Sequence, residues 1–363
     1  MLEHKHIMLL VTERCNLKCI YCYEHRKSAR VMSFDVAKSI LDTTLSTYSP
    51  QTHVVIEIFG GEPFTNFELI KQIDNYLCDT YGHLRISYET TTNGTLVHGE
   101  IQEWLRINKD KFFVALSLDG FRKMHNCNRV FADGTGSYDS IDIDFFSKTW
   151  FGCPAKLTIS HKTLPYMAEG IEYIHRMGFK CDATLSVGLD WNAEESLPIL
   201  ASELNKLINY YIENPEIPLC TMLNMDFRLV FTPFDKDYRF CGAGLEMICY
   251  DAKGNAYPCQ GFAPISIGEI SENYKDFDQT KFRLTDNNPC KKCQWLRLCP
   301  NCYAANLQST GNIQQVDQNL CQFFKYCILA SARIQFKRIM KKNHLTYDDQ
   351  LILKAISKVQ KEI

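Results

Sequence analysis

The chain has 363 residues, of which 45% are hydrophobic, and a formal net charge of −2 at neutral pH. This length suffices for one large α/β domain and a smaller one, and the near-neutral charge provides no basic field that would attract nucleic acid. The longest early apolar run, residues 7–11, is too short for a signal peptide or a membrane span. We therefore expect a cytoplasmic protein that binds neither nucleic acid nor a membrane.

Short β-rich runs alternate with helical patterns from residue 7 to about 190. Strands are predicted at 7–12, 53–59, 84–91, 112–117, 155–160 and 179–187. Helices are predicted after Ser33 as N-cap, at 66–81, around 100–107, near 140–148, from Pro165 to Gly178, and near 194–212. Six β-α repeats predict an α/β fold with a partial (β/α)6 TIM-like barrel.

Unusual residues follow most of these strands. They are the cysteine loop 12–23, Gly60-Gly61-Glu62-Pro63, Thr92-Asn93-Gly94, Ser117-Leu118-Asp119-Gly120 and Asp190-Trp191. Because the active site of such a barrel lies at the carboxyl ends of its strands, these segments should meet at one rim.

Three cysteines, Cys15, Cys19 and Cys22, stand on the loop after the first strand. Three thiolates at this spacing can hold three corners of a [4Fe–4S] cluster and leave the fourth iron open for another ligand. The alternatives are three buried cysteines or a zinc knuckle. A zinc site usually needs four ligands, and the nearest further candidate is His25.

This loop resembles that of the radical S-adenosylmethionine (radical SAM) superfamily, which carries an aromatic residue at the position of Tyr21. The resemblance implies that SAM chelates the open iron and that its reductive cleavage yields a 5′-deoxyadenosyl radical. Gly60, Gly61 and Glu62 look like the motif that holds the SAM amino group in that family. Two glycines let backbone approach a ligand closely, and a carboxylate accepts from an ammonium group.

The same resemblance implies SAM contacts for Asn93 and Ser117, and for Asp119, which could equally be a turn-forming aspartate before Gly120. Arg129 matches the family more loosely as a partner of the SAM carboxylate. His125 and His161 have no partner at metal-ligand spacing. The sequence identifies no catalytic acid or base.

Seventeen cysteines are present, and eight of them lie between residues 241 and 321. A secreted disulfide scaffold does not fit, because no signal peptide is visible and disulfides persist poorly in the cytosol. Metal ligation explains the short spacings better. The cysteines outside the two groups are expected to be small buried apolar residues: Cys78, Cys127, Cys153, Cys181, Cys220 and Cys327.

The eight-cysteine region, with a predicted hairpin at 251–259, resembles the SPASM domain of one radical SAM subgroup. The resemblance implies two auxiliary [4Fe–4S] clusters, and therefore three clusters in all. Cluster I would be held by Cys241, Cys249, Cys259 and Cys302. Cluster II would be held by Cys290, Cys293, Cys299 and Cys321.

One departure from that pattern is the gap Pro300-Asn301 before Cys302, which is two residues where three are usual, and Cys327 could substitute. The competing interpretation is a zinc ribbon built from Cys290, Cys293, Cys299 and Cys302.

The expected domains are a radical SAM barrel at 1–235, a SPASM domain at 236–327 and a helical segment at 328–363. This last segment carries five basic residues, Arg333, Lys337, Arg338, Lys341 and Lys342. A solvated helix face explains them better than a patch for an acidic partner.

The leading hypothesis is a radical SAM/SPASM oxidoreductase that modifies or cross-links a peptide or protein, as a maturase of ribosomal peptides. The runner-up is an anaerobic sulfatase-maturating enzyme, which forms formylglycine. Those enzymes place an aspartate base after the cysteine matching Cys259, where this chain has Gln260. A multi-cluster electron carrier and a zinc-bound adaptor belong to other classes.

The expected partners are the peptide or protein substrate and an external electron donor of the flavodoxin or ferredoxin type. Because the first predicted strand begins at residue 7, leader recognition is expected on a separate protein or on the C-terminal region.

Overall fold

A computed structural model describes residues 4–189, 191–231, 241–278 and 282–360. Its eight strands form one curved sheet in the order β6-β5-β4-β3-β2-β1-β7-β8, in which every neighbouring pair except β7-β8 is parallel. The strands are β1 (His4–Thr12), β2 (His53–Gly60), β3 (Arg85–Thr92), β4 (Phe112–Ser117), β5 (Pro154–Ile159), β6 (Lys180–Leu185), β7 (Met247–Tyr250) and β8 (Ala256–Tyr257).

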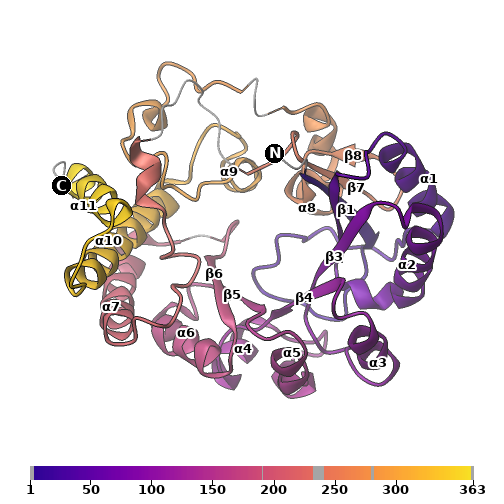
Figure 1. Ribbon diagram of the computed structural model, residues 1–363, viewed down its shortest axis with the longest axis horizontal. Helices are drawn as coiled ribbons and strands as arrows, with labels where there is room; N and C mark the ends of the chain where they lie inside the picture. Colours follow the sequence, from indigo (N-terminus) through magenta and orange to yellow (C-terminus); the bar gives the residue numbers. More distant parts are fainter. Residues whose placement is uncertain (1–3, 190, 232–240, 279–281, 361–363) are drawn as a thin grey trace.

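Helices cover the outer side of the curved sheet (Figure 1). In the first half of the chain they are α1 (Phe34–Leu45), α2 (Phe67–Tyr81), α3 (Glu100–Ile107), α4 (Arg122–Asn128), α5 (Ile143–Thr149), α6 (Met167–Arg176) and α7 (Ala193–Glu213). The second half contains α8 (Pro264–Ile267) and α9 (Tyr303–Thr310), which pack on the opposite face of β1, and then α10 (Gln318–Met340) and α11 (Tyr347–Gln360). The predicted parallel, barrel-like β/α arrangement is confirmed.

Strand β1 is buried on both faces, which explains its unbroken apolar sequence. Ile7, Leu9 and Val11 belong to the core between the sheet and its helices. Met8 and Leu10 point the other way, into a second core shared with the C-terminal region. This alternation is the period-2 geometry of a strand whose two faces are both covered.

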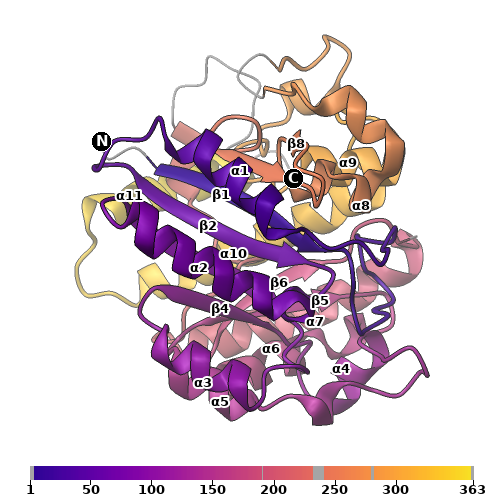
Figure 2. The ribbon, with the colours of Figure 1, turned by 90° about the vertical axis from the view of Figure 1, so that its right-hand side faces the viewer.

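The C-terminal region continues the sheet. Strand β7 pairs in parallel with β1, on the edge opposite to β2, and the predicted hairpin joins β7 to β8. Figure 2 shows this region lying beyond β1, next to α8 and α9. Thus β1, which leads into the cysteine loop, is held on both edges.

Several elements differ from the expectations. Helix α4 was not predicted, because its seven residues are mostly polar and have no clear apolar period. Helix α10 starts at Gln318, so the expected boundary between 327 and 328 lies inside a single helix. The expected boundary near 235, and Asp190 of the segment after β6, fall outside the described residues.

Four of the five basic residues at this end of the chain are exposed, as expected for a solvated face, whereas Arg338 is half-buried. Arg338 donates to the carbonyl oxygens of Tyr211, Asn214 and Ile217 at 2.9–3.1 Å, and Lys341 donates to Ile212. These cations therefore cap the carboxyl end of α7, where backbone carbonyls lack helical partners.

None of the helices in the described ranges combines the length and the apolar character needed to cross a bilayer.

Candidate functional site

A cavity of about 370 Å³ opens at the carboxyl ends of the strands. Seven sequence-predicted residues line it together with the three cysteines of the loop: Tyr21, Gly60, Gly61, Glu62, Asn93, Ser117 and Arg129. One rim therefore gathers almost all of the residues predicted for the cysteine loop and for SAM binding, as the rule for parallel barrels anticipates.

The cysteine loop forms one wall of this cavity. Cys15, Cys19 and Cys22 are partly exposed to it, and their thiols interact electrostatically. Burial raises the pKa of the Cys15 thiol to about 12. A cation that replaces the proton would therefore stabilise this sulfur as a thiolate, as an iron ligand requires.

Two cationic side chains point at the cysteine sulfurs. Lys27 Nζ donates a hydrogen bond to Cys22 Sγ at 2.8 Å, and Arg129 Nη1 lies 4.0 Å from Cys19 Sγ. They offset negative charge that would otherwise accumulate on three neighbouring thiolates.

The two glycines after β2 lie against the cysteine loop itself. A Cβ on Gly60 would stand 2.2 Å from the carbonyl oxygen of Thr12, and one on Gly61 would stand 2.3 Å from that of Arg14. These glycines were expected to let the backbone approach a ligand closely. In the structure they let it approach the backbone of the cysteine loop. Only glycine lets the loop pass here.

Glu62 is fully buried and accepts three hydrogen bonds. The donors are Thr92 Oγ1 at 2.8 Å, the Asn93 amide at 2.8 Å and the Phe64 amide at 3.2 Å. Burial raises the pKa of Glu62 to about 7, although these donors oppose the shift. The carboxylate therefore fastens the end of β2 to the end of β3 while it borders the cavity.

Asn93 is fixed by its own contacts. Its Nδ2 donates to Asn16 Oδ1 at 2.9 Å, and its Oδ1 accepts from the amide of Thr95 at 3.0 Å. Ser117 ends β4 at the cavity wall.

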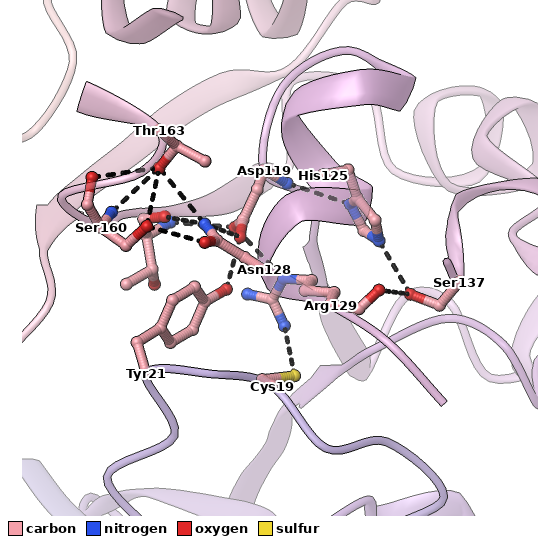
Figure 3. Close-up of polar contacts among 10 residues, drawn as sticks. Cys19, Tyr21, Asp119, His125, Asn128, Arg129, Ser137, Ser160 and Thr163 are labelled. Carbon is pink, nitrogen blue, oxygen red and sulfur yellow. Dashed lines mark hydrogen bonds and ion pairs between the residues drawn. The ribbon is translucent and has the colours of Figure 1, made fainter. Parts of the chain in front are cut away.

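Asp119 lies behind the wall, outside the cavity lining. Figure 3 shows it at the centre of a buried network: Tyr21 Oη donates to one carboxylate oxygen at 2.5 Å, and Arg129 Nε lies 3.1 Å from the other. Asn128 Nδ2 and the Thr158 amide also donate to it. The Arg129 guanidinium also lies 5.4 Å from the Tyr21 ring centroid. Because Asp119 binds both Tyr21 and Arg129, it orients two residues that face the cavity.

The three histidines considered from sequence have ordinary structural environments. His125 is fully buried: its Nδ1 accepts from the Asp119 amide at 3.2 Å, so Nε2 carries the proton toward Ser137 Oγ at 3.0 Å. Burial lowers the pKa of His125 to about 3. His161 is exposed, and His25 Nδ1 contacts the carbonyl of Tyr23.

Charged residues inside the barrel also line the cavity and were missed from the sequence. Lys156 on β5 pairs with Asp182 on β6 at 2.8 Å, and Glu57 on β2 pairs with His6 on β1 at 2.8 Å. The sequence did contain a signal for these residues. Each is an ionisable residue among the apolar residues of its strand, and alternate positions of a barrel strand face the interior. Gln260, which follows Cys259, reaches the same cavity.

Seven of the eight C-terminal cysteines, all except Cys299, fall into two neighbourhoods. The Cys259 thiol interacts electrostatically with Cys302, Cys241 and Cys249. The Cys321 thiol interacts in the same way with Cys290 and Cys293. Cys327 is buried beside Cys220.

Within the described ranges, no three His, Cys, Asp or Glu side chains converge as ligands of one metal ion. A four-iron cluster spreads its cysteine sulfurs over several irons, so its ligands need not converge in this way.

Comparison with known proteins agrees with this geometry. The family model described as "Radical SAM superfamily" matches residues 9–143. An uncharacterised protein of Methanocaldococcus jannaschii is 31% identical over 280 residues, which cover 75% of this chain and 90% of that protein. The chain belongs to the radical SAM superfamily. Membership implies a [4Fe–4S] cluster and SAM, and the cavity wall with three free thiols fits such a cluster.

This radical SAM protein is also related to maturases. A cysteine-type anaerobic sulfatase-maturating enzyme of Clostridium perfringens is 23% identical, over 86% of this chain and 93% of that enzyme. A solved structure described as native anSMEcpe with bound AdoMet and Cp18Cys peptide has a TM-score of 0.72 at 20% identity, covering 98% and 99% of the two chains. The fold is therefore shared along almost the whole chain.

Proposed function

We propose that this protein is a radical SAM enzyme that oxidises or cross-links side chains of a peptide or protein. The observation that carries the proposal is the cavity itself, which has three cysteines on one wall and the ion pair Lys156–Asp182 on another. When bound, the cluster and SAM supply a carbon-centred radical that can remove a hydrogen atom from a substrate. The peptide in the related structure supports a substrate of that class.

The residues around the cavity would hold these groups. Cys15, Cys19 and Cys22 would ligate the cluster, and Arg129 would face the SAM carboxylate. The backbone around Gly60 and Gly61 would border the SAM amino group. Asn93 and Ser117 are placed to meet polar parts of SAM, since both line the cavity.

The two C-terminal neighbourhoods are proposed to hold auxiliary clusters. Cys241, Cys249, Cys259 and Cys302 would form site I, and Cys290, Cys293, Cys299 and Cys321 would form site II. Tyr23, on the cysteine loop, interacts electrostatically with both Cys22 and Cys259. An electron that leaves an oxidised substrate would thus find an acceptor next to the radical-forming site. We further propose that an external protein donates electrons and that a separate protein recognises the leader of the substrate.

Iron analysis tests the cofactor assignment. After anaerobic reconstitution we expect about twelve irons per chain, the content of three four-iron clusters. About four irons with bound zinc would recast residues 241–321 as a structural zinc region. Reductant should convert SAM to 5′-deoxyadenosine, whereas an electron carrier would give none.

Formylglycine formation is the second candidate, because sulfatase-maturating enzymes are among the relatives. Gln260 counts against it, since it stands at the position where those enzymes are expected to carry their base. Its side chain reaches the cavity, and its Oε1 is buried with no hydrogen-bond partner in the described residues. An amide is a very poor proton acceptor. We therefore expect no aldehyde from a cysteine-containing sulfatase peptide with the native enzyme, and aldehyde formation would reverse this ranking.

A further inference from the structure

A second cavity, of about 550 Å³, adjoins the candidate site. It lies between β6, residues 221–229, residues 297–309 and α10. Asp182, Thr184, Leu185 and Val187 line both this groove and the site cavity, so the two spaces meet along β6.

Strand β6 is the outer edge of the sheet, and its outward backbone is only half covered. The amides of Lys180 and Ser186 donate toward β5, so the odd-numbered residues between them direct their N–H and C=O groups outward. Thr221 covers the first half, because its amide donates to Cys181 O at 3.1 Å and its hydroxyl donates to Ala183 O at 2.9 Å.

The second half of the edge is open toward the groove. Within the described ranges, no hydrogen bond engages the outward N–H or C=O of Leu185. An exposed edge of this kind is a template for another extended chain, which would gain main-chain hydrogen bonds there. The open half also lines the candidate site.

Asn301 supplies an independent indication of a ligand. It lines the groove and is 7% exposed, and its Nδ2 is buried with no hydrogen-bond partner in the described residues. A buried amide donor without an acceptor is costly, and a carbonyl oxygen from a ligand would satisfy it. The rest of the lining is largely apolar and includes Met222, Met225, Leu298 and Phe324.

We propose that this groove binds the stretch of the peptide substrate next to the reacting residue, in an extended conformation along the open half of β6. The backbone of Leu185 pairs with that stretch, and Asn301 donates to one of its carbonyl oxygens. The apolar lining accepts one large apolar side chain at a fixed distance from the reacting residue. This inference rests on the proposed function, and it adds the conformation and sequence preference of the substrate.

Synthetic peptides test it without knowledge of the natural substrate. The probes are fluorescent ten-residue peptides of alanine with a central cysteine, in which one position at a time carries leucine or glutamate. Anisotropy is read anaerobically on the reconstituted enzyme with SAM. We expect leucine at one position to bind about tenfold more tightly than glutamate there, the scale of burying one aliphatic side chain.

Backbone N-methylation of the best peptide then tests the strand pairing. Methylating one amide near the preferred leucine should remove the tenfold gain, while methylating its neighbour, which points the other way in a strand, should not. This comparison leaves the protein unaltered. Equal effects at all amides, or no dependence on leucine at any position, would overturn the proposal.

Variants locate the site. Asn301→Ala should weaken binding of the best peptide severalfold, whereas the exposed Asn343→Ala should bind as the native enzyme does. Unchanged affinity in Asn301→Ala would show that the peptide binds elsewhere. Cleavage of SAM by the native enzyme without peptide is measured in parallel. If SAM is cleaved but peptide binding shows none of these dependences, the groove fails while the proposed function stands.

Discussion

Asp119 organises the candidate site although it does not line the cavity. Four contacts converge on its two oxygens, and one of them is an ion pair with the buried Arg129. Asp119→Asn would leave Arg129 as a buried charge without its counter-ion. We expect a loss of about 3 kcal/mol in the free energy of unfolding, measured by urea denaturation. A loss below about 0.5 kcal/mol, the level of an ordinary surface substitution, would contradict the assigned role.

His125 makes stability depend on pH. Its folded-state pKa of about 3 lies below the unfolded value, so the unfolded chain binds a proton more readily between these values. The contribution of neutral His125 to the free energy of unfolding is therefore present at pH 7 and decreases as the pH falls below about 6.5. From pH 7 to pH 5 the decrease is about 2 kcal/mol. His125→Gln should flatten this part of the unfolding profile, whereas the exposed His344→Gln should leave it unchanged.

At the scale of elements, the close contact between the end of β2 and the cysteine loop depends on Gly60 and Gly61, which have no side chains. Gly61→Ala would place a Cβ 2.3 Å from the Arg14 carbonyl oxygen and push the loop away. We expect reconstituted iron to fall by about four atoms per chain, the content of one cluster. Gly134→Ala is the matched control, because its positive φ imposes backbone strain but no atom lies within 4 Å of the new Cβ. Full iron content in Gly61→Ala would refute this account.

The sequence predicted most of these elements because their signals are local. Ser33 and the apolar stripe of α1 define a helix by themselves, and the Cys15–Cys22 spacing defines the loop. The bonds of Glu62 to Thr92 and Asn93, and the pairing of Lys156 with Asp182, join residues on or just after neighbouring strands that are 26–31 positions apart in the sequence, which no local pattern encodes. The helical start at Gln318 was missed because Asp317, its N-cap, precedes a polar first turn.

At the scale of the whole molecule, the barrel and the C-terminal region share β1. Removing residues 232–363 would expose the edge of β1 that pairs with β7 and uncover the apolar face of Met8 and Leu10. We expect the fragment 1–231 to aggregate when expressed alone, since open edges and apolar faces promote association. Co-expression of 232–363 should return it to the soluble fraction. A soluble, cooperatively unfolding 1–231 fragment would contradict this dependence.

Because β1 pairs with β7, the strand that leads into the cysteine loop is fully paired only late in translation. β1 leaves the ribosome first, but β7 follows 235 residues after Thr12. At about 5–20 residues per second, that interval lasts roughly 12–47 s. Throughout this time the nascent chain carries three cysteines next to β1, which lacks its β7 partner. The final partner of the radical-forming loop therefore arrives late in translation, and slow elongation would lengthen the period in which those thiols are open to oxidation.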